Sequence, residues 1–138
     1  MEKFHFIDHT GDTGVVVYGK SLAELFRNAA ESLFTIVTEI KTIQQTTAHH
    51  LILQAPGVEE LLVTWLNEFL YLFDTRRLLF RRFKIEELDS CHVKAVAWGE
   101  EYNEERHPIK TLIKAVTFHQ LRIEEQGGVW KSQIIFDL

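Results

Sequence analysis

The feature that most constrains the fold is a long stripe of apolar residues at helical spacing that begins just after Ser21. Ser21-Leu22-Ala23-Glu24 has the pattern of a capping box, in which the serine side chain accepts a hydrogen bond from a first-turn amide and the glutamate reaches back. The apolar positions then recur without a break: Leu22, Leu25, Phe26, Ala29, Ala30, Leu33, Phe34 and Val37. A helix with this pattern has an apolar face of about four turns that other parts of the chain must cover.

A second helix is predicted after Ala55-Pro56-Gly57, a sequence that interrupts regular structure. Glu59 and Glu60 place acidic side chains in its first turn, where the helix dipole favours negative charge. Its apolar stripe is rich in aromatic residues and consists of Leu61, Leu62, Trp65, Leu66, Phe69, Leu70 and Phe73. A stripe of this kind is typical of core packing rather than of a ligand site.

The remaining segments have the composition of strands. They are residues 4–7, 15–18, 40–53, 80–88, 91–98, 111–124 and 129–137. Turn signals at Asp89-Ser90 and at residues 126–128 indicate antiparallel hairpins. Because each helix has one apolar face and a sheet has a matching one, the sequence predicts the α+β class, with two helices packed on a mostly antiparallel sheet. The order helix then strands occurs twice, which suggests an internal structural duplication.

The composition limits the class of protein. A single domain over residues 1–138 is expected, because 138 residues with 46% hydrophobic content bury a full core without disulfides or structural metals. The single cysteine, Cys91, has no partner for an intramolecular disulfide, which favours a reducing compartment. No signal peptide or transmembrane segment is present in this sequence, so a cytoplasmic protein without a membrane partner is expected. A net charge of −5 makes the whole domain a poor free-standing nucleic-acid binder, so any contact with RNA is expected to be indirect.

The densest group of chemically active residues is the stretch Asp8-His9-Thr10-Gly11-Asp12-Thr13-Gly14. Glycine, aspartate and threonine are also common in ordinary turns, so the composition alone fits a connecting loop. The flanking segments are predicted strands, which places Asp8 and Asp12 at adjacent strand ends on a rigid support. Two carboxylates held in this way repel each other unless a cation or a proton lies between them. The stretch is therefore a candidate metal or proton-handling site.

The chain ends in an apolar strand followed by acidic groups. Residues 134–138 are Ile-Ile-Phe-Asp-Leu, and a strand this apolar is expected to be anchored in a sheet. The carboxylate of Asp137 and the terminal carboxylate of Leu138 are then fixed hard oxygen ligands, suited to calcium, magnesium or manganese. Zinc is not expected, because no set of cysteine and histidine residues has ligand spacing.

Lys114 is unusual because it places a charge inside the strand-like segment 113–119. If that strand is half-buried, Lys114 shares a face with Val116 and Phe118, and its ammonium group needs an anionic partner or ligand. In the alternative, the lysine stem lies over apolar surface and its ammonium group reaches water. His119 falls on the opposite face and fits an ordinary strand histidine.

Two charged segments have ordinary as well as functional explanations. Residues 99–108 form an acidic stretch without periodicity, most simply a solvated hairpin loop, although His107-Pro108 fixes the backbone beside an imidazole. Residues 76–84 form the one basic run. It fits contact with RNA or an acidic partner, but it also fits the solvated face of a strand, and we favour the second interpretation. The sequence contains no P-loop, no G-x-G-x-x-G and no G-x-S-x-G motif.

Five fragments, in this order and spread over the whole chain, resemble the archease family. They are Asp8-His9-Thr10-Gly11-Asp12, Gly19-Lys20-Ser21-Leu22, Trp98-Gly99-Glu100-Glu101 with His107-Pro108 after it, Lys114-Ala115-Val116-Thr117-Phe118-His119, and Phe136-Asp137-Leu138. The sequence departs from the usual family pattern at Gly11, where alanine is common, and at Thr13, where a β-branched aliphatic residue is common.

This resemblance implies an accessory protein rather than an enzyme. Its implied partner is the tRNA-splicing RNA ligase, which uses GTP and manganese; the accessory protein promotes guanylylation of the ligase histidine and allows multiple turnover. The resemblance also implies that Asp12, Asp137 and the Leu138 carboxylate bind a divalent cation, with calcium favoured over magnesium or manganese, and that Lys114 takes part in activation. RNA is then contacted only through the ligase. A stand-alone metal-dependent phosphoester hydrolase and a chaperone-like binding protein are the alternative functions.

Overall fold

The computed structural model describes residues 1–9, 11–118 and 121–138. Its elements in chain order are β1 (Phe4–His9), β2 (Asp12–Gly19), α1 (Leu22–Val37), the 3-10 turn η1 (Ile40–Thr42), β3 (Thr47–Gln54), α2 (Val58–Arg76), β4 (Leu78–Leu88), β5 (His92–Glu101), β6 (Ala115–Thr117), β7 (Ile123–Gln126) and β8 (Val129–Asp137).

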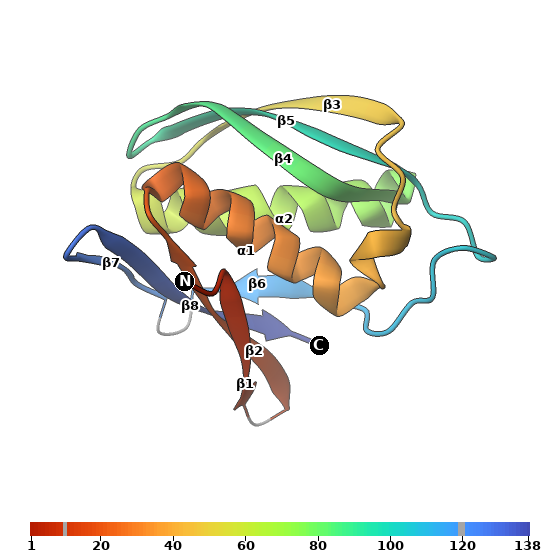
Figure 1. Cartoon of the computed structure of the whole chain (residues 1–138), viewed down its shortest axis with the longest axis horizontal. Helices are drawn as coiled ribbons and strands as arrows, with labels where there is room; N and C mark the ends of the chain where they lie inside the picture. The colour runs from red at the N-terminus through yellow and green to blue at the C-terminus, as the bar shows by residue number, and fades with distance from the viewer. Residues whose placement is uncertain (10, 119–120) are drawn as a thin grey trace.

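The two α-helices form a middle layer between two antiparallel sheets (Figure 1). The larger sheet has five strands in the order β1-β2-β8-β6, with β7 also paired to β8, and the smaller sheet has the order β3-β5-β4. The predicted α+β class is confirmed, with the strands distributed over two sheets rather than one. A second sheet is needed because α2 buries three consecutive residues, Leu61, Leu62 and Val63, and so has apolar surface on more than one side.

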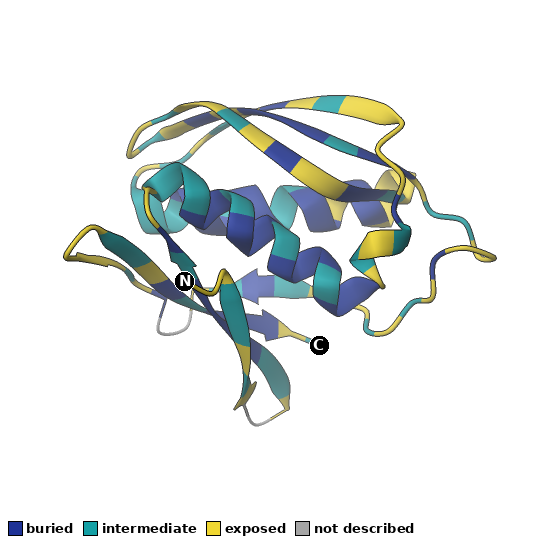
Figure 2. Cartoon of the chain, in the orientation of Figure 1, coloured by how far each residue is buried: buried dark blue, intermediate teal, exposed yellow. Residues whose placement is uncertain are grey.

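The core is built around the aromatic residues of α2, and the buried residues lie where the helices face the sheets (Figure 2). Trp65 is fully buried, and its Nε1 atom donates a hydrogen bond to the backbone oxygen of Phe26 at 2.9 Å. The Trp65 and Phe69 rings meet edge to face, with centroids 4.7 Å apart. Phe34 on α1 and Phe80 on β4 extend the cluster, with centroids 6.0 Å apart. The aromatic stripe is therefore core packing, as the sequence predicted.

Both helices have defined ends. The Ser21 side chain accepts a hydrogen bond from the Glu24 amide at 3.1 Å, which confirms the predicted cap of α1. After α2, Arg77 has a left-handed backbone with φ of 55°, and its amide donates to the Phe73 carbonyl oxygen at 2.9 Å. The basic run 76–84 thus contains the end of α2 as well as the start of β4.

Neither α1 nor α2, the α-helices in the described part of the chain, is long and apolar enough to cross a membrane.

Two segments with strand composition are not strands. Ile40–Thr42 forms a single 3-10 turn before β3 begins. Residues 111–114 have no regular structure, because the preceding chain follows α1, where the Lys110 amide donates to the Val37 carbonyl oxygen at 2.8 Å. Pairing with β8 begins at Ala115–Thr117. Composition favours extended backbone, whereas a strand also needs a neighbouring strand to bond to.

Replacing Trp65 by alanine is expected to lower the free energy of unfolding by about 3–5 kcal/mol, because it leaves a cavity in the centre of the core. Tyr71→Ala on the same helix is the control, since this side chain is 59% exposed and the expected change is within about 0.5 kcal/mol. Urea unfolding followed by circular dichroism measures both values. A loss below about 1 kcal/mol for Trp65→Ala would contradict the packing described.

Candidate functional site

The predicted site residues converge at one end of the five-stranded sheet. β8 lies between β2 and β6, and Thr13 of β2 lies opposite Phe136 of β8. The same register, extended by one residue, places Asp12 beside Asp137 on neighbouring strands. Leu138 follows directly.

Asp12 and Asp137 belong to the outward face of this sheet. Phe136 is fully buried in the core, and successive residues of a strand point to opposite faces. Asp137 is exposed and Asp12 is half-buried. Asp8 lies opposite Thr13, and so belongs to the face opposite to Asp12. The predicted pairing of Asp8 with Asp12 is therefore wrong, because β1 and β2 are paired as far as His9 and Asp12, and this register puts the two aspartates on opposite faces of the sheet.

Lys114 reaches the same corner of the sheet through its backbone. Its amide donates a hydrogen bond to the Asp137 carbonyl oxygen at 2.8 Å, just before β6 begins. The side chain is exposed and makes no ion pair with any described residue, so the prediction of a half-buried lysine held by an anion is wrong. Lys114 borders a hollow of about 220 Å³ beside the C-terminal ends of the helices, which Val37 and Phe73 also line. This arrangement agrees with the alternative, in which the stem covers apolar surface and the ammonium group reaches water.

The oxygen groups at this sheet end fit a hard divalent cation. The two side-chain carboxylates, together with the carboxylate predicted at Leu138, are donors that calcium and magnesium prefer. Within residues 1–9, 11–118 and 121–138, no group of three or more His, Cys, Asp or Glu side chains is arranged to hold a metal ion. The sheet end thus offers an incomplete set of ligands, which water or a partner's oxygen atoms would complete, and cation binding there stays a prediction. Thr10 and His119 of the sequence motifs lie outside the described residues.

A buried polar network at residues 100–107 is a feature that the sequence did not predict. Glu100 is 8% exposed and His107 is 1% exposed. His107 Nε2 lies 2.8 Å from Glu100 Oε2, and the Gln44 backbone amide donates to the same oxygen at 2.7 Å. Arg106 pairs with the other carboxylate oxygen. The interpretation of residues 99–108 as a solvated loop is wrong for this network. The signal in the sequence was an acidic residue close to an apolar strand segment, followed by a His-Pro pair.

The hydrogen bonds define the protonation of His107. The Asn103 backbone amide donates to Nδ1 at 2.8 Å. The ring proton therefore lies on Nε2, which donates to Glu100. Burial raises the pKa of Glu100, but the hydrogen bonds from Gln44 and His107 and the charge of Arg106 outweigh burial, and the net effect lowers that pKa. Glu100 is therefore a charged, fully bonded carboxylate at neutral pH.

This network helps to position the chain that leads to Lys114. Thr38 Oγ1 donates to the Pro108 carbonyl oxygen at 2.7 Å, and the Lys110 amide donates to the Val37 carbonyl oxygen at 2.8 Å. Residues 107–110 are thereby fixed against the C-terminal end of α1, and Lys114 follows on a chain that is held at both ends.

A comparison with known protein families identifies the chain. The model of the Archease protein family matches residues 4–138. The chain belongs to the archease family. The protein archease of Methanosarcina mazei is 38% identical over 141 residues, which cover 99% of this chain and 97% of that protein. The protein archease of Methanothermobacter thermautotrophicus is 36% identical, with 100% of each chain covered.

Solved structures share the fold of this archease-family chain. A solution structure of protein 1598 of Methanobacterium thermoautotrophicum has a TM-score of 0.86 at 35% identity, with 100% of each chain covered. A crystal structure from Thermotoga maritima, described as an archease and possible chaperone, has a TM-score of 0.68 and covers 96% of this chain and 94% of that one. At 22% identity, the second structure supports the fold alone.

Glu100→Gln is expected to destabilise this archease-family chain by about 1–3 kcal/mol at neutral pH, because it removes the charge that Arg106 and His107 contact. Since the folded pKa of Glu100 is lowered, its charged form stabilises the fold above the unfolded pKa, and this contribution disappears as the pH falls through the folded pKa. The stability difference between wild type and variant should therefore shrink below about pH 4.5. Urea unfolding at a series of pH values measures it.

Glu101→Gln is the matched control for this prediction. Glu101 is the next residue, is exposed and makes no ion pair with the described residues, so its substitution changes the net charge equally without disturbing the network. Equal effects of the two substitutions at neutral pH would show that the buried network does not stabilise the fold.

Proposed function

We propose that this archease-family protein activates the GTP-dependent RNA ligase that joins tRNA exons, by promoting guanylylation of the ligase histidine and so allowing multiple turnover. The observation that supports this proposal is the convergence of Asp12, Asp137, the Leu138 carboxylate and Lys114 at one solvent-accessible end of a sheet. Oxygen ligands and an ammonium group at the same end of the sheet suit a partner site that handles a nucleoside triphosphate. The sequence itself has no nucleotide-binding motif, which fits an accessory role.

Asp12, Asp137 and the Leu138 carboxylate would hold a divalent cation in this role. When bound, such a cation neutralises phosphate charge. Calcium suits this donor set best because it accepts many oxygen ligands in flexible geometry, and magnesium or manganese are alternatives. The register between β2 and β8 places both residues at neighbouring strand ends.

Lys114 would contribute a positive charge that does not compete for the cation. An ammonium group repels a metal ion but binds a phosphate or an acidic group of a partner. The side chain has no ion-pair partner among the described residues, so its charge is not neutralised within the chain. The bond between its amide and the Asp137 carbonyl oxygen keeps this charge at the same sheet end as the carboxylates.

Reconstitution with the cognate ligase tests the proposal. Adding this protein to the ligase with GTP, manganese and RNA ends should accelerate formation of the ligase–GMP adduct and allow many turnovers. Asp12→Asn and Asp137→Asn should each weaken calcium binding, measured by calorimetry, and remove the acceleration, because a neutral amide is a poorer ligand for a hard cation. Folding should survive both changes, because neither residue belongs to the buried core.

Two further variants sharpen the same experiment. Asp8→Asn should keep calcium affinity, because Asp8 lies in the same hairpin but belongs to the other face of the sheet. Lys114→Ala should also keep calcium affinity yet lose acceleration of the ligase. Full acceleration with Lys114→Ala would show that the lysine only extends into solvent, and no acceleration by the wild-type protein would refute the proposed function.

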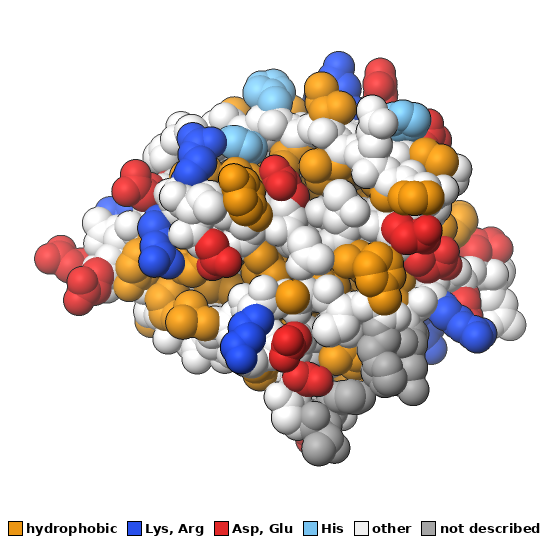
Figure 3. All heavy atoms as spheres, turned by 180° about the vertical axis from the view of Figure 1, so that it is seen from behind, with side chains coloured by type: hydrophobic (Ala, Val, Ile, Leu, Met, Phe, Trp, Pro, Cys, Tyr) orange, Lys and Arg blue, Asp and Glu red, His pale blue; other side chains and the backbone are white. Residues whose placement is uncertain are grey.

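The two alternative functions give different results. A stand-alone phosphoester hydrolase would show turnover without the ligase, and Asp12→Ala would abolish that turnover. A chaperone-like protein would suppress aggregation of unrelated clients. The large exposed apolar side chains come from separate segments, namely Met1, Phe6, Ile52, Tyr71, Leu112 and Phe118. On the face seen from behind, hydrophobic side chains are interspersed with acidic and other polar groups (Figure 3), which gives no specific support for client binding.

A further inference from the structure

We infer that a basic groove between α1 and the edge strand β4 binds the phosphodiester backbone of single-stranded RNA directly. The groove has a volume of about 630 Å³, and its lining includes the five cationic side chains Lys3, Arg27, Lys41, Arg81 and Arg82. It lies away from the sheet end that carries Asp12 and Asp137. This inference goes beyond the proposed activation of the ligase, because it gives the chain its own contact with RNA.

The cations of this groove are mostly not neutralised by neighbouring acids. Two acidic residues, Glu24 and Glu31, also line the groove, and Lys3 pairs with Glu31 at 3.1 Å. Arg27, Lys41, Arg81 and Arg82 make no ion pair with any described residue, although the chain as a whole has 20 acidic residues against 15 lysines and arginines. Such a local excess of positive charge on an acidic protein attracts an anionic ligand to this one place.

Two of the arginines are already held in position. Arg81 Nη1 donates to the Lys41 carbonyl oxygen at 3.1 Å, and an irregularity in β4 lies between Phe80 and Arg82. The Arg82 guanidinium lies 4.4 Å from the centroid of the Trp98 ring, which restricts its motion. Each guanidinium has five N–H donors, so both keep donors for phosphate oxygens after these contacts.

The lining favours RNA over an acidic protein partner. Protein interfaces are usually centred on exposed aromatic or aliphatic anchors, whereas nucleic-acid interfaces are polar and positively charged. The apolar residues that line this groove are Ile40 and Phe83. They offer little such surface, because Phe83 is 8% exposed and Ile40 is partly covered. The net charge of −5 led to the expectation of indirect contact with RNA, but net charge does not describe how the charges are distributed.

Fluorescence anisotropy with a short, labelled single-stranded RNA and this protein alone tests the inference. Binding should weaken as salt rises, with a slope of log affinity against log salt of roughly −2 to −3, because each phosphate contact contributes about −0.7. Arg27→Gln/Lys41→Gln should weaken binding about tenfold or more at low salt and reduce the slope by roughly 1.4. Neither side chain makes a hydrogen bond or an ion pair with a described residue, so folding should be unchanged.

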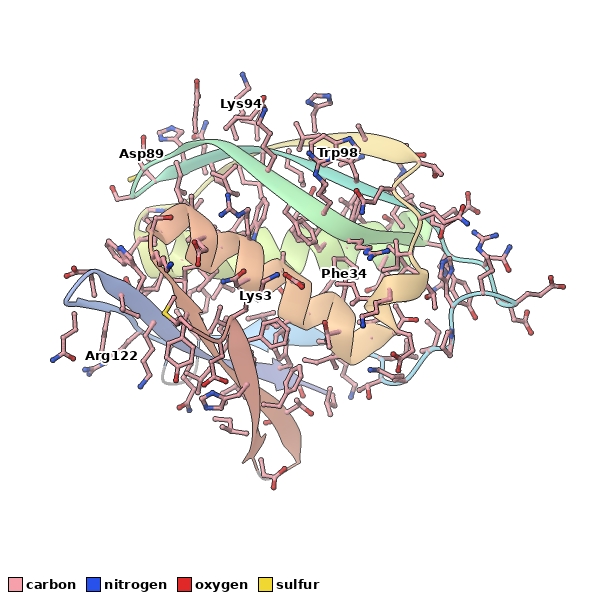
Figure 4. The ribbon with its side chains drawn as sticks, in the orientation of Figure 1. Lys3, Phe34, Asp89, Lys94, Trp98 and Arg122 are labelled. Carbon is pink, nitrogen blue, oxygen red and sulfur yellow. The ribbon has the colours of Figure 1, made fainter. Side chains whose placement is uncertain are left out.

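Arg122→Gln/Lys131→Gln is the matched control, since it removes the same charge from a second hollow that these two residues line. Figure 4 shows Arg122 at the lower left, beside β7, apart from Lys3, which pairs with Glu31 of α1. This control should bind RNA within about twofold of wild type. Urea midpoints and circular dichroism establish whether both double variants are folded. If the groove variant is destabilised, RNA binding by Arg82→Gln provides a second test of the groove.

Three results would overturn the inference. They are the absence of RNA binding by the wild-type protein at low salt, equal weakening by the groove variant and the control, and displacement of the RNA by polyglutamate at an equal or lower concentration of charged groups. The last result would assign the groove to an acidic protein partner. Because the ligase is absent from this assay, failure here is distinct from failure of the proposed activation.

Discussion

The pairing of β8 with both β2 and β6 is the interaction on which the candidate site depends. Ile134, Ile135 and Phe136 are all buried, so the last strand is covered on both faces and held in one register. A chain terminus held in this way does not fray, and its last two residues acquire defined positions. Asp12 from the first hairpin and the Lys114 backbone are then brought to the same place by hydrogen bonding to β8 and not by proximity in sequence.

The sequence predicted the features that depend on local patterns. The cap at Ser21, the stripe of α1, the aromatic core of α2 and the strand at residues 129–137 agree with the structure, because each is encoded by residues close together in the chain. The division of strands between two sheets depends on pairing over long distances, which composition does not encode. The same limit explains why Asp8 was expected to pair with Asp12, whereas the register brings Asp137 beside Asp12.

The other differences between prediction and structure concern how deeply individual side chains are buried. A half-buried Lys114 was one of two alternatives, based on the strand composition of residues 113–119, yet regular pairing begins only at Ala115 and the lysine side chain is exposed. Conversely, Glu100 and His107 are buried although their segment is acidic, because each satisfies the other and Gln44 completes the bonding of the carboxylate. Hydropathy describes single residues, whereas a buried polar network is stabilised only by all its members together.

The central claim is that the end of the five-stranded sheet binds a divalent cation. Amide signals in proton–nitrogen correlation spectra, followed during titration with calcium, test it most directly. If the cation binds there, the perturbed signals should group at the start of β2, at Lys114 and Ala115, and at the end of β8, while β3 and β4 are unaffected. Perturbations centred on the acidic residues 100–105, or none at saturating calcium, would contradict it.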